Sequence, residues 1–451
     1  MADGYSADAA ASSVVRRTLR NRARYEVANN GYAAGIIQTL ANDVIGTGPR
    51  LQMLTDSDDT NRLIELEFAA WAKRIDLPGK LRTMRMAKAH DGEVFALFGD
   101  NTALTGPVKL DLRLLEADQV ATPDFTGMDA NAVDGIVLDA FGNPKTYHVL
   151  TDHPGATGAL GASQKTDIDA SQMIHWFRVD RPGQHRGVSE IASTLGLYAQ
   201  LRDFVDSVIA AAKTAADHAL VMKTTLLPDE AAAAEIEPFA ELEISPNSGV
   251  FCPEGWEPFQ LKAEQPSTTT PQFVQFIINQ AARPWSMPKN IALCDSSEYN
   301  YASGRLDHQT YYKAIRVEQA QCESFVLDRI FDAWMAAARD VIGAPIGQWP
   351  HQWFWDGWEH IDPLKEANAE DIRLKNRSTN HAATYARRGQ DWEEEVYQSL
   401  FEDARKEQMW ADIRKSLSLP PAPLPGPTGQ PAQAPAEVPD EKEATQETDD
   451  E

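Results

Sequence analysis

Apolar positions recur with helical spacing in the first part of the chain and with the shorter spacing of strands beyond residue 90. Ile36, Leu40 and Val44 fall on one face, which predicts a helix over about 33–45 that ends at Gly46. An arginine-rich helix is predicted before it, from about residue 14, and an amphipathic helix after it, over Thr60–Ile75. The N-terminal part is therefore expected to be helical.

Four short segments then have the composition of strands and are separated by turn residues, as at Phe141-Gly142-Asn143-Pro144. They are Glu93–Phe98, Lys109–Leu115, Val133–Leu138 and Thr146–Leu150. Short strands joined by tight turns are typical of antiparallel sheets. We therefore predict an α+β fold with long helices and a largely antiparallel sheet.

Three later stretches have helical patterns. The first is Ser189–Ala216, with Ser189 as its N-cap and a second half of small side chains. Small side chains either reflect helix propensity alone or allow close packing in a crowded ring of helices. A shorter helix is predicted from Thr270, as N-cap, to Arg283-Pro284. The third covers about Arg305–Ile342, would be about 55 Å long if unbroken, and is expected to be kinked.

The C-terminal part combines aromatic residues, helix caps and low complexity. A cluster of tryptophans more commonly forms a core or a subunit contact than a ligand site, and here it comprises Trp349, Trp353, Trp355 and Trp358. Asp362-Pro363 and Asp391-Trp392-Glu393-Glu394 are helix-capping patterns, and the second predicts a helix to about Trp410. From Leu419 the chain is rich in proline and then in acidic residues, a composition typical of disorder.

The formal net charge is −25, and this acidity is not confined to the C-terminus. Residues 437–451 contain eight acidic residues and one lysine, so the rest of the chain still carries −18. Proteins hold duplex DNA with clustered Lys and Arg. The chain therefore either has no nucleic-acid partner or handles DNA without gripping it tightly.

The sequence also indicates a compartment and excludes several chemistries. Its three cysteines are far apart, and it has neither an apolar run of about 18 residues nor a signal-peptide pattern, which predicts a reducing cytoplasm and no membrane span. The motifs GxxxxGK(S/T), HExxH and GxSxG do not occur, and the ten histidines lack metal-ligand spacing, so no metal or cofactor is predicted. Asp295, Ser296 and His308 have the residue types of a hydrolytic triad, but their proximity in sequence does not establish one.

Several short sequences, in a fixed order, together resemble the portal proteins of lambda-like tailed bacteriophages. The most informative is Arg181-Pro182-Gly183-Gln184-His185-Arg186-Gly187-Val188-Ser189. The others are Tyr25–Ala33 followed by Val44–Gln52, Leu115–Asp118, Val133–Ile136 followed by Gly142–Pro144, Trp358–Glu366 and Gly389–Glu394. The resemblance covers about residues 14–410. It implies a structural protein that forms a dodecameric ring around an axial DNA channel at one capsid vertex.

The resemblance also implies a regional plan and a set of partners. The implied regions are an N-terminal wing (1–188), a first stem helix (189–218), a clip (219–268), a second stem helix (269–285), a channel loop (286–304), a wing helix and return (305–361), a crown (362–418) and a Pro-rich acidic tail (419–451). The implied partners are further copies of the chain, double-stranded DNA read without sequence preference, the terminase large subunit, the head–tail connector, the major capsid protein and the scaffold, with no membrane. Assembly in the host bacterial cytoplasm and a final location in the virion are expected.

Three sets of site residues follow from the same resemblance. They are the channel-loop residues Lys289, Asn290, Ser296, Ser297, Tyr299, Asn300, Tyr301 and Arg305; the partner-binding clip residues Glu235, Glu237, Glu241, Glu243, Glu254 and Glu257; and the subunit-interface residues Arg181, Arg186, Arg16 and Arg20. A solvated helix face is the alternative for the N-terminal arginines, and a polar turn for Arg181–Gly187. Two other hypotheses stay open, namely a hydrolytic enzyme with buried carboxylates and a structural adaptor without a channel.

Overall fold

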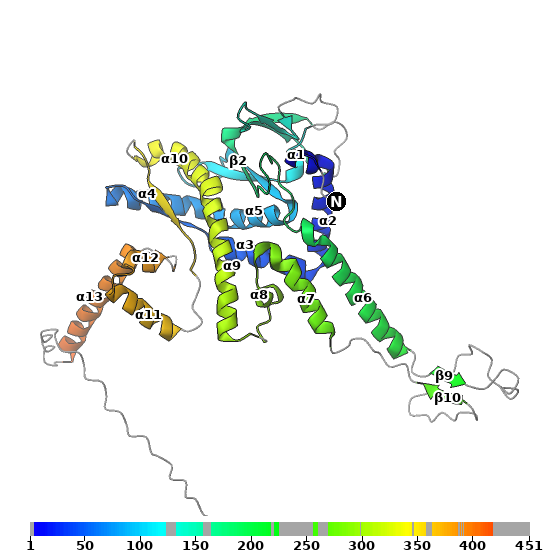
Figure 1. The fold of residues 1–451 in the computed structure, drawn as a ribbon. Helices are drawn as coiled ribbons and strands as arrows, with labels where there is room; N and C mark the ends of the chain where they lie inside the picture. Colours follow the sequence, from blue (N-terminus) through cyan, green and yellow to red (C-terminus); the bar gives the residue numbers. More distant parts are fainter. Residues whose placement is uncertain are drawn as a thin grey trace, which may run out of the picture. The chain divides into compact units, whose positions relative to one another are not determined.

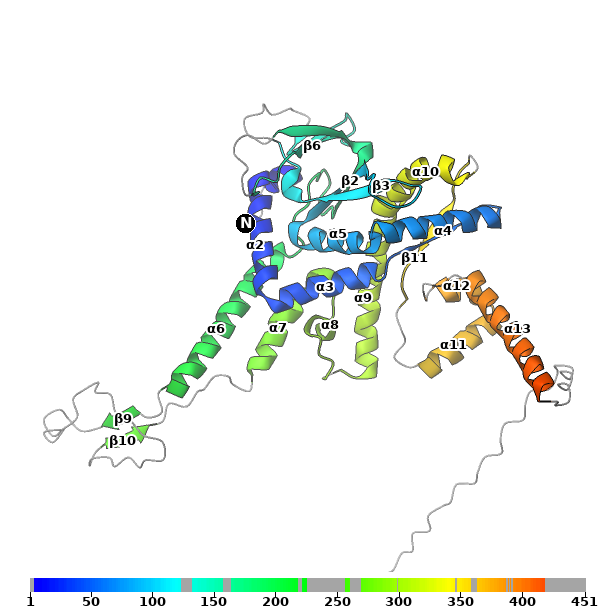
Figure 2. The same ribbon diagram turned by 180° about the vertical axis from the view of Figure 1, so that it is seen from behind.

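The computed structural model describes residues 4–122, 132–156, 164–217, 221–224, 256–259, 269–297, 299–344, 347–357, 363–386, 388, 390 and 392–417. Within them the chain is a mixture of helices and antiparallel strands (Figure 1, Figure 2), in agreement with the predicted α+β class. Residues 1–390 form one compact unit, and residues 391–451 form another. No helix in these described ranges is long and apolar enough to cross a membrane.

The N-terminal helices are α1 (Ala7–Ala10), α2 (Ser13–Asn29), α3 (Gly31–Ile45), α4 (Asp58–Arg74) and α5 (Leu77–Asp91). The helices predicted from the apolar pattern are confirmed as α2, α3 and α4. The pattern did not predict α5, because its buried face includes Arg85 and Lys88 beside Leu81 and Met84. Charged side chains on a buried face obscure the apolar period from which a helix is recognised.

The strands between residues 93 and 177 form two antiparallel sheets that share a small core. One sheet has the order β3-β2-β8, with β2 (Glu93–Asp100), β3 (Leu110–Leu115) and β8 (Met173–Phe177). The other has the order β4-β5-β6-β7, with β4 (Ala132–Val133), β5 (Ile136–Leu138), β6 (Pro144–Leu150) and β7 (Lys165–Asp169). Phe95 and Tyr147 meet between the sheets with ring centroids 5.8 Å apart. Three of the four predicted strand segments are confirmed as β2, β3 and β6. The fourth, Val133–Leu138, is not one strand, because Asp134 and Gly135 have positive φ angles and form a tight turn that separates β4 from β5.

The helix expected from Ser189 begins later, since α6 spans Leu195–Asp217 and follows a short 3-10 turn, η3 (Ala192–Thr194). Ser189 is not its N-cap. The Ser189 hydroxyl and the Glu190 amide instead donate to the carbonyl of Ala89 on α5, at 3.4 and 2.9 Å. This segment is bound to the end of α5 before the helix starts.

A second helix, α7 (Thr270–Ala282), lies beside α6 (Figure 1), and Thr269 rather than Thr270 occupies its N-cap position. The rings of Phe204 and Phe273 join the two helices, with centroids 4.7 Å apart. Between them in sequence, β9 (Val221–Thr224) pairs with β10 (Trp256–Phe259) in antiparallel register. The predicted end of α7 at Arg283-Pro284 is confirmed, because the 3-10 turn η4 (Arg283–Trp285) follows directly.

The long helix predicted after residue 304 consists of α9 (Tyr301–Cys322), a π-helical turn, η5 (Glu323–Leu327), and α10 (Asp328–Ile342). The π turn interrupts the helix, and α10 continues in a different direction (Figure 1). Phe331 and Trp334 of α10 pack on Phe68 and Trp71 of α4. These aromatic rings form the centre of the largest core.

The tryptophan cluster contributes to this core through a small sheet in which β1 (Arg50–Met53) pairs with β11 (His351–Phe354). Trp353 is buried there, Trp349 and Trp355 pack against its edge, and Trp358 lies outside the described residues. The remaining helices are α11 (Pro363–Lys375), α12 (His381–Ala386) and, in the second unit, α13 (Trp392–Ser416). α13 extends six residues beyond its predicted end, and the predicted caps Asp362 and Asp391 and the tail from residue 418 lie outside the described residues.

Candidate functional site

A buried carboxylate at the start of β2 binds the segment Arg181–Ser189 to the sheet. Glu93 is fully buried and accepts hydrogen bonds from Arg186 Nη2 at 2.6 Å and from the Gly187 amide at 2.9 Å. On the neighbouring strand β8, His175 Nε2 lies 3.1 Å from Glu93 Oε2. Three separate segments of the chain therefore meet at one carboxylate.

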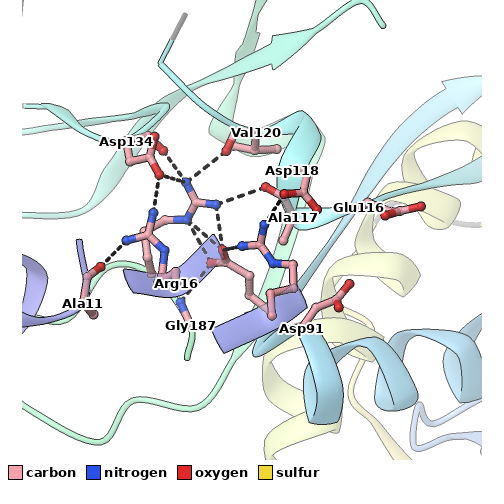
Figure 3. Close-up of polar contacts among 12 residues, drawn as sticks. Ala11, Arg16, Asp91, Glu116, Ala117, Asp118, Val120, Asp134 and Gly187 are labelled. Carbon is pink, nitrogen blue, oxygen red and sulfur yellow. Dashed lines mark hydrogen bonds and ion pairs between the residues drawn. The ribbon is translucent and has the colours of Figure 1, made fainter. Parts of the chain in front are cut away.

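Helix α2 adds two arginines to this site (Figure 3). Arg16 donates to the Ala11 carbonyl and pairs with Asp134, while Arg20 pairs with Asp118 and has its Nη2 3.6 Å from Glu93 Oε1. The two side chains are only 3% and 5% exposed. We call Glu93, Asp118, Asp134, Arg16, Arg20, Arg186 and His175 the Glu93 cluster. Its three arginines face three acidic groups, so its formal charges cancel.

Arg186 is the most extensively bonded member of the Glu93 cluster. Its Nε and Nη2 donate to Glu93, Nη1 donates to the carbonyls of Val120, at 3.0 Å, and Asp134, and Nη2 also reaches the Ala117 carbonyl at 3.3 Å. All three guanidinium nitrogens are thus hydrogen-bonded. This offsets the large desolvation cost of a buried cation.

Electrostatics keep Glu93 and Arg16 ionised at neutral pH. Burial alone would raise the pKa of Glu93, but Arg186 and the hydrogen bond from His175 hold it well below its ordinary value of 4.5. Burial lowers the pKa of Arg16 to about 10, and Arg186 acts in the same direction. Burial also lowers the pKa of His175 below 6.5, although Glu93 opposes the shift. Fixed ion pairs beside a neutral imidazole hold segments in place and do not exchange protons in the neutral range.

A second buried ionic group forms around Glu190, four residues after Arg186. Its Oε2 accepts hydrogen bonds from Trp285 Nε1 at 2.7 Å and Arg85 Nη2 at 3.1 Å, and its Oε1 lies 3.8 Å from Lys88 Nζ. Glu318 of α9 balances the second charge, with Arg85 Nε at 3.2 Å. We call these five residues the Glu190 cluster. It joins α5, α9, the end of α7 and the segment that leads into α6.

Two glycines allow the main chain to cross between these clusters. A Cβ at Gly187 would lie 2.2 Å from the Gly92 carbonyl oxygen, and a Cβ at Gly92 would lie 2.3 Å from the carbonyl carbon of Val188. Gly92 also has a φ of +93°, which favours glycine. The two backbones are in contact here, so a side chain at either position would force them apart.

Three of the four arginines predicted at a subunit interface are inside the chain instead. Arg16, Arg20 and Arg186 are 3%, 4% and 1% exposed, and their partners belong to the same protomer. They are unavailable to a neighbouring subunit, and Arg16 and Arg20 do not form a solvated helix face either. The remaining one, Arg181, is exposed and donates to the Tyr5 carbonyl at 3.0 Å. The sequence identified these arginines as candidates for ion pairs, but it did not show that their acidic partners lie within the same chain.

The predicted channel loop is partly helical, because α8 covers Lys289–Leu293. Asn290 is only 7% exposed, and its Nδ2 lies 2.9 Å from His308 Nε2, so it packs α8 against α9 and is not a free loop residue. Lys289 Nζ donates to Gln275 of α7 at 3.1 Å. Of the other predicted residues, Ser296, Ser297, Asn300 and Arg305 are exposed, Tyr299 is half-buried, and the Tyr301 side chain lies outside the described residues.

The six predicted clip glutamates fall mostly where the structure gives no description. Glu257 is exposed on β10, opposite Lys223 on β9. The other five, Glu235, Glu237, Glu241, Glu243 and Glu254, lie outside the described residues. Partner binding by this set stays a prediction.

The residues that resembled a hydrolytic triad do not form one. His308 faces Asn290, and a carboxylate oxygen of Asp295 accepts the Ser297 amide at 2.9 Å. Ser296 Oγ lies 3.5 Å from Asn290 Nδ2. A triad requires the histidine to bond to both the serine and the carboxylate, and here Asn290 lies between Ser296 and His308 while the Asp295 carboxylate accepts a main-chain amide.

One group of potential metal ligands occurs among the described residues, formed by Glu116, Asp118 and His153. Arg24 already occupies the cationic position beside them, with Nη2 2.9 Å from Glu116 and Nη1 3.0 Å from Asp118. A guanidinium that pairs with both carboxylates leaves little negative charge for a metal ion.

Glu93 and Glu190 were missed in the sequence, although each carried a signal. Glu93 opens an otherwise apolar strand, and Glu190 follows a Gly-Val-Ser segment that continues into an apolar helix. An acidic residue in such a position is expected to have a buried partner. The sequence alone could not identify those partners, because Arg186 and Glu93 are 93 residues apart.

A family model and one relative carry the same description. The family model described as phage portal protein, lambda family, matches residues 1–319. A probable portal protein of Halomonas phage phiHAP-1 is 26% identical over 440 residues, which cover 86% of this chain and 80% of that protein. The chain is also similar to the neck of an empty GTA particle, with 13% identity, a TM-score of 0.48 and coverage of 93% and 95% of the two chains. The neck of a native GTA particle, computed with C12 symmetry, gives 12% identity, a TM-score of 0.44 and coverage of 82% and 91%.

Proposed function

Because this chain belongs to the lambda family of phage portal proteins, we propose that it forms the portal ring at one vertex of a phage or phage-like capsid. The family match over residues 1–319 carries the proposal. The chain is a structural protein and not an enzyme, and its most buried carboxylates are accordingly neutralised by arginine and lysine. The proposed ring has twelve copies around an axial channel through which double-stranded DNA enters during packaging and leaves at ejection.

The regional plan is part of this proposal. We assign the wing to residues 1–188 and 305–361, the stem to α6 and α7, the clip to 219–268, the channel loop to 286–304 and the crown to 362–418. The adjacent helices α6 and α7, with paired strands between them in sequence, are compatible with a stem that leads into a clip. The clip is proposed to bind the terminase large subunit and later the head–tail connector, while the outer surface meets the major capsid protein and the scaffold.

The charge of the chain suits passage of DNA. An acidic protein repels phosphates and offers few sites at which DNA would stick, which favours sliding. Exposed cations near the proposed loop, such as Arg305, would contact the phosphate backbone of DNA weakly and without regard to its base sequence. ATP hydrolysis is assigned to the terminase, because this chain lacks the GxxxxGK(S/T) motif that holds nucleotide phosphates.

The proposal is tested by the mass and shape of the purified particle. With a chain of 49.8 kDa, a closed ring of twelve copies would weigh about 600 kDa. We expect mass photometry to show this species and negative-stain images to show a central hole. A stable dimer or tetramer without a channel would contradict the portal ring.

A further inference from the structure

Helix α7 has an exposed face without charge. From Gln265 to Ala282 the sequence contains no Asp, Glu, Lys or Arg, although these residues make up 24% of the chain. On α7, Phe276 is 61% exposed and Phe273 is 45% exposed. Exposed aromatic residues on a charge-depleted surface are characteristic of the centre of a protein interface.

Helix α6 has a second exposed apolar stripe. Val205 and Ile209 are one helical turn apart on the same side, and they are 40% and 47% exposed. Ala212 continues this side, and no charged residue occurs between Ser207 and Ala212. Within the protomer it is Phe204 that meets α7, while Val205 and Ile209 stay open to solvent.

We propose that the Val205–Ile209 stripe of one protomer packs against Phe276 of the next protomer. This inference rests on the proposed ring and identifies the surfaces that would close it. A cyclic ring uses two different faces of each protomer, because every copy contacts one neighbour on each side. The pair α6–α7 offers two such faces, both apolar and both uncharged at their centres.

A second copy of the chain accounts for these faces better than an unrelated partner does. An unrelated partner requires only one apolar face, whereas repetition of the same contact around a ring requires both. The side chains also suit each other chemically, because an aromatic ring on α7 can pack against aliphatic and small side chains on α6. Asp203 and Asp206 are exposed beside the stripe and provide the polar rim that interfaces usually have.

Charge insertion tests the contact. Phe276→Glu and Ile209→Glu should each reduce the ring fraction in mass photometry about tenfold or more, because an unpaired charge would be placed at the centre of the interface. Leu66→Glu on α4 is the matched control, since Leu66 is 62% exposed and lies on a different helix. It should assemble like the wild type. Far-UV circular dichroism spectra of all three variants should match that of the wild type, because the replaced side chains are exposed and the fold of the protomer does not depend on them.

A charge pair tests the identity of the two partners. In Phe276→Lys combined with Ile209→Glu, opposite charges face each other at every interface. The ring fraction of this double variant should therefore exceed that of Phe276→Lys alone and that of Ile209→Glu alone. Rings formed equally well by the wild type and Phe276→Glu, or a double variant no better than the singles, would overturn this contact while leaving the ring intact. A stable wild-type dimer or tetramer without a channel would overturn the portal ring and this inference together.

Discussion

Arg186 joins three parts of the chain because a guanidinium can donate in several directions at once. Its three nitrogens bond to the Glu93 carboxylate and to main-chain carbonyls that include those of Val120 and Ala117. A lysine offers one ammonium on a flexible stem, so it can neutralise Glu93 but cannot reach all of these acceptors. We therefore expect that only arginine can make these contacts at position 186.

Arg186→Lys should lower the free energy of unfolding by about 1–3 kcal/mol, because the lysine keeps a charge beside Glu93 but leaves buried carbonyl acceptors without a donor. Urea denaturation followed by tryptophan fluorescence would measure the change. Arg181→Lys is the matched control, because exposed Arg181 makes a hydrogen bond to the Tyr5 carbonyl and should change stability by less than about 0.5 kcal/mol. Equal effects of the two variants would contradict the role given to Arg186.

His175 gives the folded chain a dependence on pH. It lies between Phe95 and Phe177, with ring centroids 4.2 and 4.4 Å away, and burial lowers its pKa below 6.5. Below about pH 6.5 the unfolded chain binds a proton at this histidine that the folded chain does not, so stability should fall as the pH falls. Glu93 acts in the same direction only at more acidic pH, because its pKa is held well below 4.5.

The histidine contribution is separated by His175→Gln, which retains an N–H donor for Glu93 but does not titrate. Between pH 7 and pH 5, the free energy of unfolding should fall less steeply in this variant than in the wild type, measured by urea denaturation at each pH. A slope identical to that of the wild type would show that another group is responsible.

At the scale of helices and strands, sequence patterns succeeded where one face is apolar and failed where charge is buried. The strand at Glu93–Phe98 and the helix at Thr60–Ile75 were predicted closely, since β2 and α4 bury apolar side chains. Helix α5 was missed because it buries Arg85 and Lys88. The start of α6 was placed six residues too early, because Glu190 is held at α5 and by Trp285, contacts that no local pattern reveals.

The crossing of the Gly187 segment over the start of β2 should tolerate no side chain. Gly187→Ala should destabilise the chain by about 1–3 kcal/mol, because the added Cβ would collide with the backbone of Gly92. The hydrogen bond from the Gly187 amide to Glu93 opposes any movement of this segment away from β2. Gly35→Ala is a suitable control, since Gly35 lies within α3 and a Cβ there meets nothing within 4 Å. It should be neutral or stabilise by up to about 1 kcal/mol. A Gly187→Ala protein as stable as the wild type would mean that the two backbones separate without cost.

At the scale of the whole molecule, the order of short motifs was enough to identify the family, but not the residues at its contacts. Arg16, Arg20 and Arg186 appeared suited to an interface because their acidic partners, Asp134, Asp118 and Glu93, are 118, 98 and 93 residues away. The sequence left two explanations for the small side chains of α6, namely helix propensity alone and close packing in a ring. The structure adds that Val205 and Ile209 are open to solvent, and ring assembly of Ile209→Glu would distinguish the two explanations.

The net charge leads to a prediction about DNA. If the assembled protein guides DNA without gripping it, linear duplex DNA should bind more weakly than a Kd of about 1 µM at 0.15 M salt, measured by fluorescence anisotropy. Removal of residues 437–451 should not create tight binding, because the rest of the chain still carries −18. The truncated protein is therefore the informative comparison. Tight binding after truncation would mean that the acidic tail masks a cationic surface, whereas tight binding by both forms would contradict the view that the acidity of the chain keeps DNA free to slide.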